Sequence, residues 1–320
     1  MNRKIVMSLV VIVILVAALL VINRRHTSSV PELATYTQAA DSIVVRKADA
    51  VITLNRDGTT WRINEAGYPA DRGLVSTMET RMKDLALTDL ISDRPHYERY
   101  DLNPAKAIEV TVKSGNTTLR HVYLGKKSST YRHTYVRLAE RPEIYLASGS
   151  LSDDFNKSID DLRDREIVKI SKGAVESFEL VNRGRKLSFS KTVAAKDATA
   201  EAPHDAAKDA AKGAVEKTDT WVCNEYKTIA LDQERISQLL MSFDPLRAAG
   251  FSDADVKTLR APACSVKIKA FGKQITLNVY RKLDENKYLC ASSESPYAFT
   301  LDAWKAEKFV TTIDDLKAKK

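Results

Sequence analysis

One sequence motif occurs twice in the chain, as SIDDLRDRE at Ser158–Glu166 and as TIDDLKAKK at Thr312–Lys320. The agreement extends upstream of both motifs at one constant offset, which also aligns Phe155 with Phe309. Internal repetition on this scale is typical of a chain that uses one structural unit more than once. The repeat therefore predicts two copies of a single module rather than one undivided core.

A helix is part of this repeat. Asp71 and Asp232 each precede a stretch with apolar residues at helical spacing, and Asp is a favoured N-cap residue. The apolar positions are Val75, Met78, Met82 and Leu85 in the first copy and Ile236, Leu239, Phe243 and Leu246 in the second. Such a stripe predicts one amphipathic helix per copy, with its apolar side facing a core.

Strands surround this helix in both copies. Trp61 and Trp221 occupy matching places in a short strand before it. Downstream, VTVKSGNTTLRHVYLG from Val110 matches VKIKAFGKQITLNVY from Val266, and in both stretches alternating apolar residues flank a turn containing glycine. This pattern is typical of a β-hairpin. Two further strands follow in each copy, among them YVRLA from Tyr135.

The predicted fold class is therefore α+β, with two tandem modules of antiparallel sheet and packed helices. We expect an N-terminal membrane anchor at residues 1–26, a linker at 27–44, a first module at 45–167 and a second module at 168–320.

Each repeated motif contains a pair of adjacent carboxylates, Asp160 and Asp161 in one copy and Asp314 and Asp315 in the other. The neighbouring Ile and Leu are three positions apart and can pack against the sheet, so we interpret the motif as a segment that closes each module. A divalent cation site is the alternative. Two adjacent carboxylates without further oxygen ligands at loop spacing make a poor calcium site, so we predict no metal and no other cofactor.

The second copy carries an insertion at residues 192–219, between two strands that a tight turn joins in the first copy. The inserted residues are rich in Ala, Lys and Asp and nearly free of large apolar side chains, so they cannot cover a core. A tolerated surface insertion is the simpler interpretation, and an arm that tethers or docks a partner is the alternative.

The N-terminal segment Ile5–Ile22 carries no charge and would span about 27 Å as a helix, close to the hydrocarbon thickness of a bilayer. Asn23, Arg24 and Arg25 follow it in place of a small-residue cleavage site, which favours an uncleaved single-pass anchor over a signal peptide. Long C-terminal domains translocate largely regardless of flanking charge. We therefore expect a protein of the cytoplasmic (inner) membrane whose body is extracytoplasmic or periplasmic.

The formal charge of +8 is a weak argument for nucleic acid. Arg3, Lys4, Arg24 and Arg25 flank the apolar segment and account for half of it. No run of basic residues interleaved with aromatic ones occurs, so we expect no nucleic-acid partner.

No motif of a known catalytic class is present: there is no H-E-x-x-H, no G-x-S-x-G and no P-loop. His121 and His133 flank one strand and could meet, although an unrelated surface pair is simpler. Cys223, Cys264 and Cys290 have no C-x-x-C spacing, and an odd number suits buried thiols better than a disulfide framework, although one disulfide remains open. We expect no enzymatic activity.

Aromatic residues offer a second functional interpretation, a sugar-binding platform. The candidates are Trp61, Trp221, Tyr123, Tyr131, Tyr280 and Tyr288. The matching positions of the two tryptophans favour packing within each module first. Exposed, pocket-lining Trp61 and Trp221 would favour an anchored binder of glycan or peptide, and buried ones would count against it.

In its order of segments the chain resembles the family catalogued as domain of unknown function 4340. The resemblance is carried by ITLNRDGTTWRIN, YPADRGLVSTMETRMKDL, YDLNPAKAIEVTV, VYLG, TYVRL, EIYLAS and IDDLRDREIV. It covers Val51–Val168 well and the second copy more loosely, and Asp101 stands where the family tends to place Gly. The resemblance implies a membrane-anchored protein associated with ABC-2 type permeases and with proteins similar to gliding-motility auxiliary subunits. It implies no catalytic residue.

These observations predict a non-catalytic, membrane-anchored interaction module, accessory to an ABC-type export or gliding-like envelope complex. An anchored glycan- or peptide-binding protein is the alternative. Trp61, Trp221, Asp160, Asp161, Asp314 and Asp315 are the residues that we expect to mark packing or interaction sites.

Overall fold

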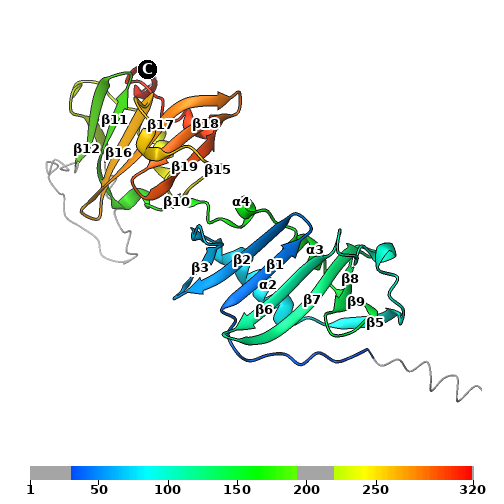
Figure 1. Cartoon of the computed structure of the whole chain (residues 1–320). Helices are drawn as coiled ribbons and strands as arrows, with labels where there is room; N and C mark the ends of the chain where they lie inside the picture. The colour runs from blue at the N-terminus through cyan, green and yellow to red at the C-terminus, as the bar shows by residue number, and fades with distance from the viewer. Residues whose placement is uncertain (1–29, 193–219, 319–320) are drawn as a thin grey trace, which may run out of the picture. The chain divides into compact units, whose positions relative to one another are not determined.

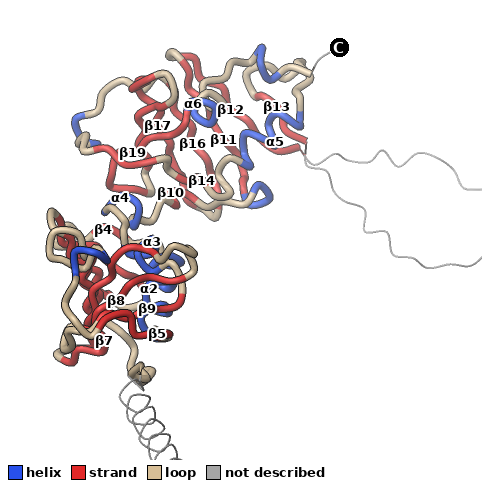
Figure 2. Tube along the Cα trace, turned by 90° about the vertical axis from the view of Figure 1, so that its right-hand side faces the viewer, coloured by secondary structure: helices blue, strands red, loops and turns tan. Residues whose placement is uncertain are grey.

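A computed structural model describes residues 30–192 and 220–318. The chain divides into two compact units between Asp164 and Arg165. The sequence predicted this boundary three residues later, between residues 167 and 168. Strands dominate both units and helices are few (Figure 2). The expected anchor at residues 5–22 lies outside the described residues, as does the insertion apart from Thr192. Within the described ranges, no helix is long and apolar enough to cross a membrane.

The first unit is built on a nine-stranded antiparallel sheet with the strand order β4-β3-β2-β1-β6-β7-β8-β9-β5 (Figure 1). Its elements are β1 (Ser42–Lys47), β2 (Ala50–Asp57), β3 (Thr60–Ile63), β4 (Tyr68–Pro69), α2 (Arg72–Lys83), β5 (Leu87–Ser92), the 3-10 helix η1 (Tyr97–Tyr100), β6 (Ile108–Ser114), β7 (Thr117–Lys127), β8 (His133–Leu138), β9 (Ile144–Ser148), α3 (Leu151–Phe155) and α4 (Ile159–Leu162).

The second unit has an eight-stranded antiparallel sheet with the order β13-β12-β11-β16-β17-β18-β19-β15, and a separate pair of β10 with β14. Its elements are β10 (Glu166–Val168), η2 (Lys172–Ala174), β11 (Val175–Asn182), β12 (Arg185–Thr192), β13 (Thr220–Cys223), α5 (Gln233–Met241), β14 (Leu246–Arg247), β15 (Gly250–Ser252), η3 (Val256–Thr258), β16 (Cys264–Ala270), β17 (Lys273–Asp284), β18 (Lys287–Ser292), β19 (Ser295–Asp302), α6 (Ala303–Ala306) and η4 (Asp314–Leu316).

The two sheet orders correspond strand by strand, except that β4 has no partner in the second unit. In each sheet, the strand that comes first in the sequence, β1 or β11, lies in the middle. On one side it forms a three-strand meander with β2 and β3, or with β12 and β13. The four-strand meander β6 to β9 corresponds to β16 to β19 on the other side, as the sequence predicted. The sequence did not predict β5 and β15, the short strands that follow the helix and pair beyond the meander at the far edge.

Each unit has its own core beneath its helix. In the first, Val75, Met78 and Met82 of α2 pack against the inward-facing residues of the sheet. In the second, Ile236 and Leu239 of α5 do the same. The N-caps are as predicted: the Asp71 carboxylate accepts from the backbone amides of residues 73 and 74, and Asp232 accepts from those of 234 and 235.

The repeated motif closes each unit against the segment that enters the helix. The Asp71 amide donates to the Leu162 carbonyl at 2.8 Å, and the Asp232 amide donates to the Leu316 carbonyl at 2.9 Å. Both leucines are buried in the cores. The same backbone contact in both units explains why the chain repeats the motif.

Candidate functional site: an aromatic and basic groove

The strongest candidate site lies in the second unit, between α5 and α6. The buried stripe of α5 includes Ile236, Leu239 and Leu240, which leaves Met241 on the outer side of the helix. In α6, Ala306 is buried and Trp304 is not. The helical spacing that buries the core residues thus points two large apolar side chains outward.

These side chains line a groove of 320 Å³. Its walls are Gln238, Met241, Ser242, Pro245, Trp304, Lys305 and Lys308. Trp304 is 63% exposed and Met241 is 59% exposed, so the apolar surface is open to solvent. Trp and Met are enriched at protein–protein interfaces relative to the rest of a surface.

The groove is positively charged. The Lys308 amine lies 4.9 Å from the centre of the Trp304 ring, a cation–π distance. Burial lowers the pKa of Lys305; Asp302 opposes this shift, while Lys308 and Arg247 lower the pKa further. Lys305, Lys308 and Arg247 therefore lie close to one another with Asp302 as the nearby carboxylate. This excess of positive charge favours an acidic partner.

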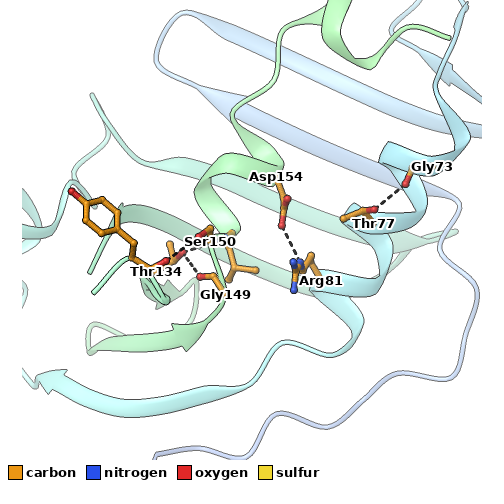
Figure 3. A network of polar contacts seen from close by, with 9 residues as sticks. Gly73, Thr77, Arg81, Thr134, Gly149, Ser150 and Asp154 are labelled. Atoms are coloured by element: carbon orange, nitrogen blue, oxygen red, sulfur yellow. Dashed lines mark hydrogen bonds and ion pairs between the residues drawn. The ribbon is translucent and has the colours of Figure 1, made fainter. Parts of the chain in front are cut away.

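The first unit closes the equivalent place. There, Arg81 at the end of α2 binds Asp154 of α3 at 2.9 Å, and Figure 3 shows the two side chains pointing toward each other. The offsets that align the copies place Ser242 at the position of Arg81 and Lys308 at that of Asp154. Neither substitute can make this ion pair.

The start of α3 is also fixed in the first unit. Thr134 on β8 donates to the Gly149 carbonyl at 2.8 Å and accepts from the Leu151 amide at 2.9 Å, and Ser150 donates to the Tyr131 carbonyl (Figure 3). The second copy has Trp304 at the position of Ser150. The short Ser150 side chain, which hydrogen-bonds within the first unit, thus corresponds to the large and exposed Trp304 side chain in the second unit.

The two predicted landmark tryptophans have a different role. Trp61 and Trp221 are each only 5% exposed and belong to the two cores. The Trp221 ring meets Phe178 edge-on at 5.1 Å, and its backbone is held by the side chain of Gln233. The remaining members of the expected sugar platform are divided between the two units. The two tryptophans are therefore packing residues.

The paired aspartates have local partners. Asp161 accepts from the amide and hydroxyl of Ser158 at 3.0 and 2.7 Å, and Asp315 accepts from Thr312 in the same way at 2.8 and 2.6 Å. Asp160 contacts Arg163 at 3.5 Å, and Asp314 contacts Lys317 at 2.6 Å. Within residues 30–192 and 220–318, no three His, Cys, Asp or Glu residues gather as a metal site.

His121 and His133 are not brought together. Ala139 pairs with the backbone of His121 at one end of β8, whereas His133 begins that strand. His121 instead lies 2.8 Å from Glu109, which also accepts from Arg46 at 2.9 Å. Burial opposes ionisation of Glu109, but these hydrogen bonds outweigh it and lower the pKa of the carboxyl.

The three cysteines are free and buried. Burial raises the pKa of Cys264 to about 12 and that of Cys290 to about 12. The Cys264 thiol donates to the Phe309 carbonyl at 2.8 Å. A thiol with so high a pKa is a poor nucleophile near neutral pH, so these groups act as small core residues.

The groove itself was missed by the sequence interpretation. Its signal was available in the repeat, because the aligned copies exchange Asp154 for Lys308 and Arg81 for Ser242 while keeping the surrounding core. The reversal of charge from Asp154 to Lys308 indicates that this surface has a different role in the second unit.

A family model described as "Domain of unknown function (DUF4340)" matches residues 61–263, which is more than half of the chain and includes parts of both units. No curated protein and no solved structure matches the chain.

Proposed function

Because the chain belongs to the family described as domain of unknown function 4340, we propose that it is a non-catalytic interaction module, accessory to an ABC-type export or gliding-like complex of the cell envelope. In this proposal, Ile5–Ile22 anchors the chain in the cytoplasmic membrane and the two units lie on the extracytoplasmic side. The permease or the auxiliary subunit of such a complex is the partner.

The open groove is the observation that carries this proposal. It offers exposed Trp304 and Met241 beside Lys305 and Lys308, at a place that the first unit closes with an ion pair. Trp is enriched among the few residues that carry most of the binding energy of protein interfaces. The fitting partner is a protein segment with apolar side chains flanked by Asp or Glu.

Photo-crosslinking in cells tests the partner directly. A photoreactive amino acid replaces Met241 in the tagged full-length chain, and the matched control carries it at Phe271, which is 73% exposed in a turn of the same unit. We expect a crosslink to an ABC permease or its auxiliary subunit from position 241 alone. Crosslinks to membrane lipid only, or equal crosslinks from both positions, would refute the docking role.

Trp304→Ala provides a second test by affinity purification in mild detergent. Because Trp304 is mostly exposed, we expect its truncation to change stability by less than about 0.5 kcal/mol. Recovery of the permease with its ATPase should nevertheless fall sharply. Full recovery from the Trp304→Ala chain would show that the groove is not the contact.

The alternative is an anchored glycan- or peptide-binding protein. The burial of the Trp61 and Trp221 rings counts against it.

A further inference from the structure

The second unit contains a cavity whose basic lining has no counterpart in the first unit. The cavity lies beside the turn that joins β11 to β12, where Asn182 pairs with Arg185. In the first unit the corresponding turn joins β1 to β2, where Lys47 pairs with Ala50. These two strand registers make the two turns directly comparable.

The comparison shows a concentrated change in chemistry. Arg183, Arg185 and Lys186 line the cavity, and the first unit has Ala48, Ala50 and Val51 at the matching positions. Tyr226 also lines it, at the position of Ala66, since Asn224 and Asn64 make the same backbone contact two residues earlier. Because both units share one architecture, the fold does not require these large side chains.

The cavity measures 790 Å³, within the usual range of small-molecule sites. Arg183 and Arg185 have no ion-pair partner within the described part of the chain, whereas Lys186 binds Glu179 at 2.6 Å. The carboxylate in the lining, Asp314, is already bound by Lys317. Two guanidinium groups therefore remain available for an anion, and guanidinium suits phosphate oxygens through paired hydrogen bonds.

The wall behind these arginines carries an acceptor without a donor. The Asn182 amide nitrogen donates to the Thr311 carbonyl at 3.1 Å, while its Oδ1 is buried and has no hydrogen-bond partner within residues 30–192 and 220–318. A buried acceptor of this kind is costly unless a donor meets it. Among the described residues, the fold therefore leaves this acceptor unsatisfied in the wall of the cavity.

The first unit occupies the same place with a longer side chain. The Lys47 amine donates to the Lys157 carbonyl at 2.8 Å, and Lys157 is the counterpart of Thr311. Asn182 makes the equivalent contact with a shorter side chain, which leaves the space beside it open.

We propose that this cavity binds a small phosphate ester, such as a glycerol phosphate or a sugar phosphate, either free or as the headgroup of a lipid. Arg183 and Arg185 bind the phosphate, and Leu187 with Tyr226 covers the carbon skeleton. The proposal is independent of the docking groove.

Calorimetry on the detergent-solubilised full-length chain tests the site with named probes. The first arm uses sn-glycerol 3-phosphate. The second uses short-chain phosphatidylglycerol, with short-chain phosphatidylcholine, a zwitterion without net charge, as the comparison. Saturable binding in the first arm alone supports a free ligand, and binding of phosphatidylglycerol that glycerol 3-phosphate displaces supports a headgroup. Absence of saturable binding in both arms would overturn the proposal.

Variants separate the cavity from general electrostatics. Arg183 has φ +48° and precedes Gly184, so Arg183→Asn removes the charge while leaving Asn-Gly, a favoured pair for this turn. Combined with Arg185→Ala, it should weaken binding by at least about tenfold, because both guanidinium groups that hydrogen-bond to the phosphate charge are removed. The control, Lys269→Ala with Lys273→Ala, removes the same charge at the other end of β16, since Asn182 pairs with Cys264 and Ala270 pairs with Lys273. It should change affinity by less than about twofold. Equal weakening by the control would refute the site.

Asn182→Lys gives the sharper contrast. It adds a positive charge to the protein but restores the side chain that occupies this place in the first unit. The cavity predicts weaker binding by the Asn182→Lys chain, whereas attraction by net charge predicts stronger binding. Unchanged thermal unfolding of each variant shows that the fold is intact.

Discussion

Asp161 and Asp315 show how one carboxylate fixes the end of a module. Each accepts from the amide and the hydroxyl of the residue three positions earlier, which places a short helical turn and directs the following leucine inward. The neighbouring Asp160 and Asp314 instead make ion pairs with Arg163 and Lys317. Adjacent residues of the same type thus differ in what they stabilise.

Asp315→Asn is expected to reduce the free energy of unfolding of the second unit by about 1 kcal/mol at neutral pH. The hydrogen bonds from Thr312 lower the pKa of Asp315, so its contribution is present above the unfolded-state pKa. The contribution is lost as the pH falls through the folded-state value. Urea unfolding from pH 7 to pH 2 measures this. Asp314→Asn is the matched control, with little expected effect; an Asp315 effect that does not shrink in acid would contradict the assignment.

The cysteines lead to a prediction about reactivity. With pKa values of about 12 and buried sulfurs, Cys264 and Cys290 should resist alkylation by iodoacetamide at pH 8 in the folded chain. Both should react when the chain is unfolded in guanidinium. Mass spectrometry of the alkylated peptides measures the difference, and rapid labelling of the folded chain would show that the thiols are accessible.

Sequence patterns predicted some of these residue roles and missed others. Asp71 and Asp232 were identified as N-caps because a cap depends on a few neighbouring residues. The exposure of Trp304 depends on how the side chains of α5, which is far away in the sequence, pack beside it. Local residue spacing could not predict this packing. Asp101 adopts φ +55°, which explains why Gly would suit that position in the family pattern.

At the scale of elements, the closing segments join the end of each unit to its middle. Besides the contact at the helix cap, the Asp164 amide donates to the Pro69 carbonyl at 2.8 Å, and the Ala318 amide donates to the Ala230 carbonyl at 3.0 Å. Each segment thereby restrains the approach to its helix from two sides. The segments are small, but they complete the cover over the core.

Leu162→Ala and Leu316→Ala test this role. Both side chains are almost fully buried, so each truncation should cost about 2–5 kcal/mol. We expect the loss of protection in hydrogen exchange to be confined to the unit that carries the substitution, because the two cores are separate clusters. Mass spectrometry of peptides from each unit resolves this, and a matching loss in the other unit would contradict separate cores.

The elements themselves were mostly predictable from periodicity. Hairpins and amphipathic helices depend on local alternation, and the turns after β6 and β16 were found where the sequence placed them. β5 and β15 were missed because each is defined by pairing with a strand that comes much later in the chain. The central place of β1 and β11 in their sheets depends on the same long-range pairing.

At the scale of the whole molecule, one architecture is present twice with different surfaces. The second unit has the groove at Trp304 and the cavity at Arg183, whereas the first has an ion pair and small residues at the matching places. Shared core positions maintain the fold in both. The function that we propose therefore depends on the positions where the copies differ, which a search for common motifs does not examine.

Introducing the first unit's ion pair into the second unit tests whether the positions that differ between the copies carry the proposed function. Ser242→Arg with Lys308→Asp should allow the contact that Arg81 makes with Asp154 and narrow the groove. We expect crosslinking from position 241 to fall by at least about tenfold, the equivalent of about 1.4 kcal/mol. Lys257→Ala, which changes the net charge by the same amount away from the groove, is the control. Crosslinking that survives the transferred pair would exclude the groove as the contact.

The pairing of β12 with β13 has a practical consequence for protein engineering. Thr192 and Thr220 lie opposite each other, and the Thr192 hydroxyl donates to the Thr220 carbonyl at 3.1 Å. The chain therefore leaves and re-enters the sheet at one point on its outermost hairpin, whatever length lies between. Since doubling a loop adds only about 0.6 kcal/mol of closure entropy, this point is where an epitope, a protease site or a fluorescent reporter can be introduced with the least disturbance to either unit.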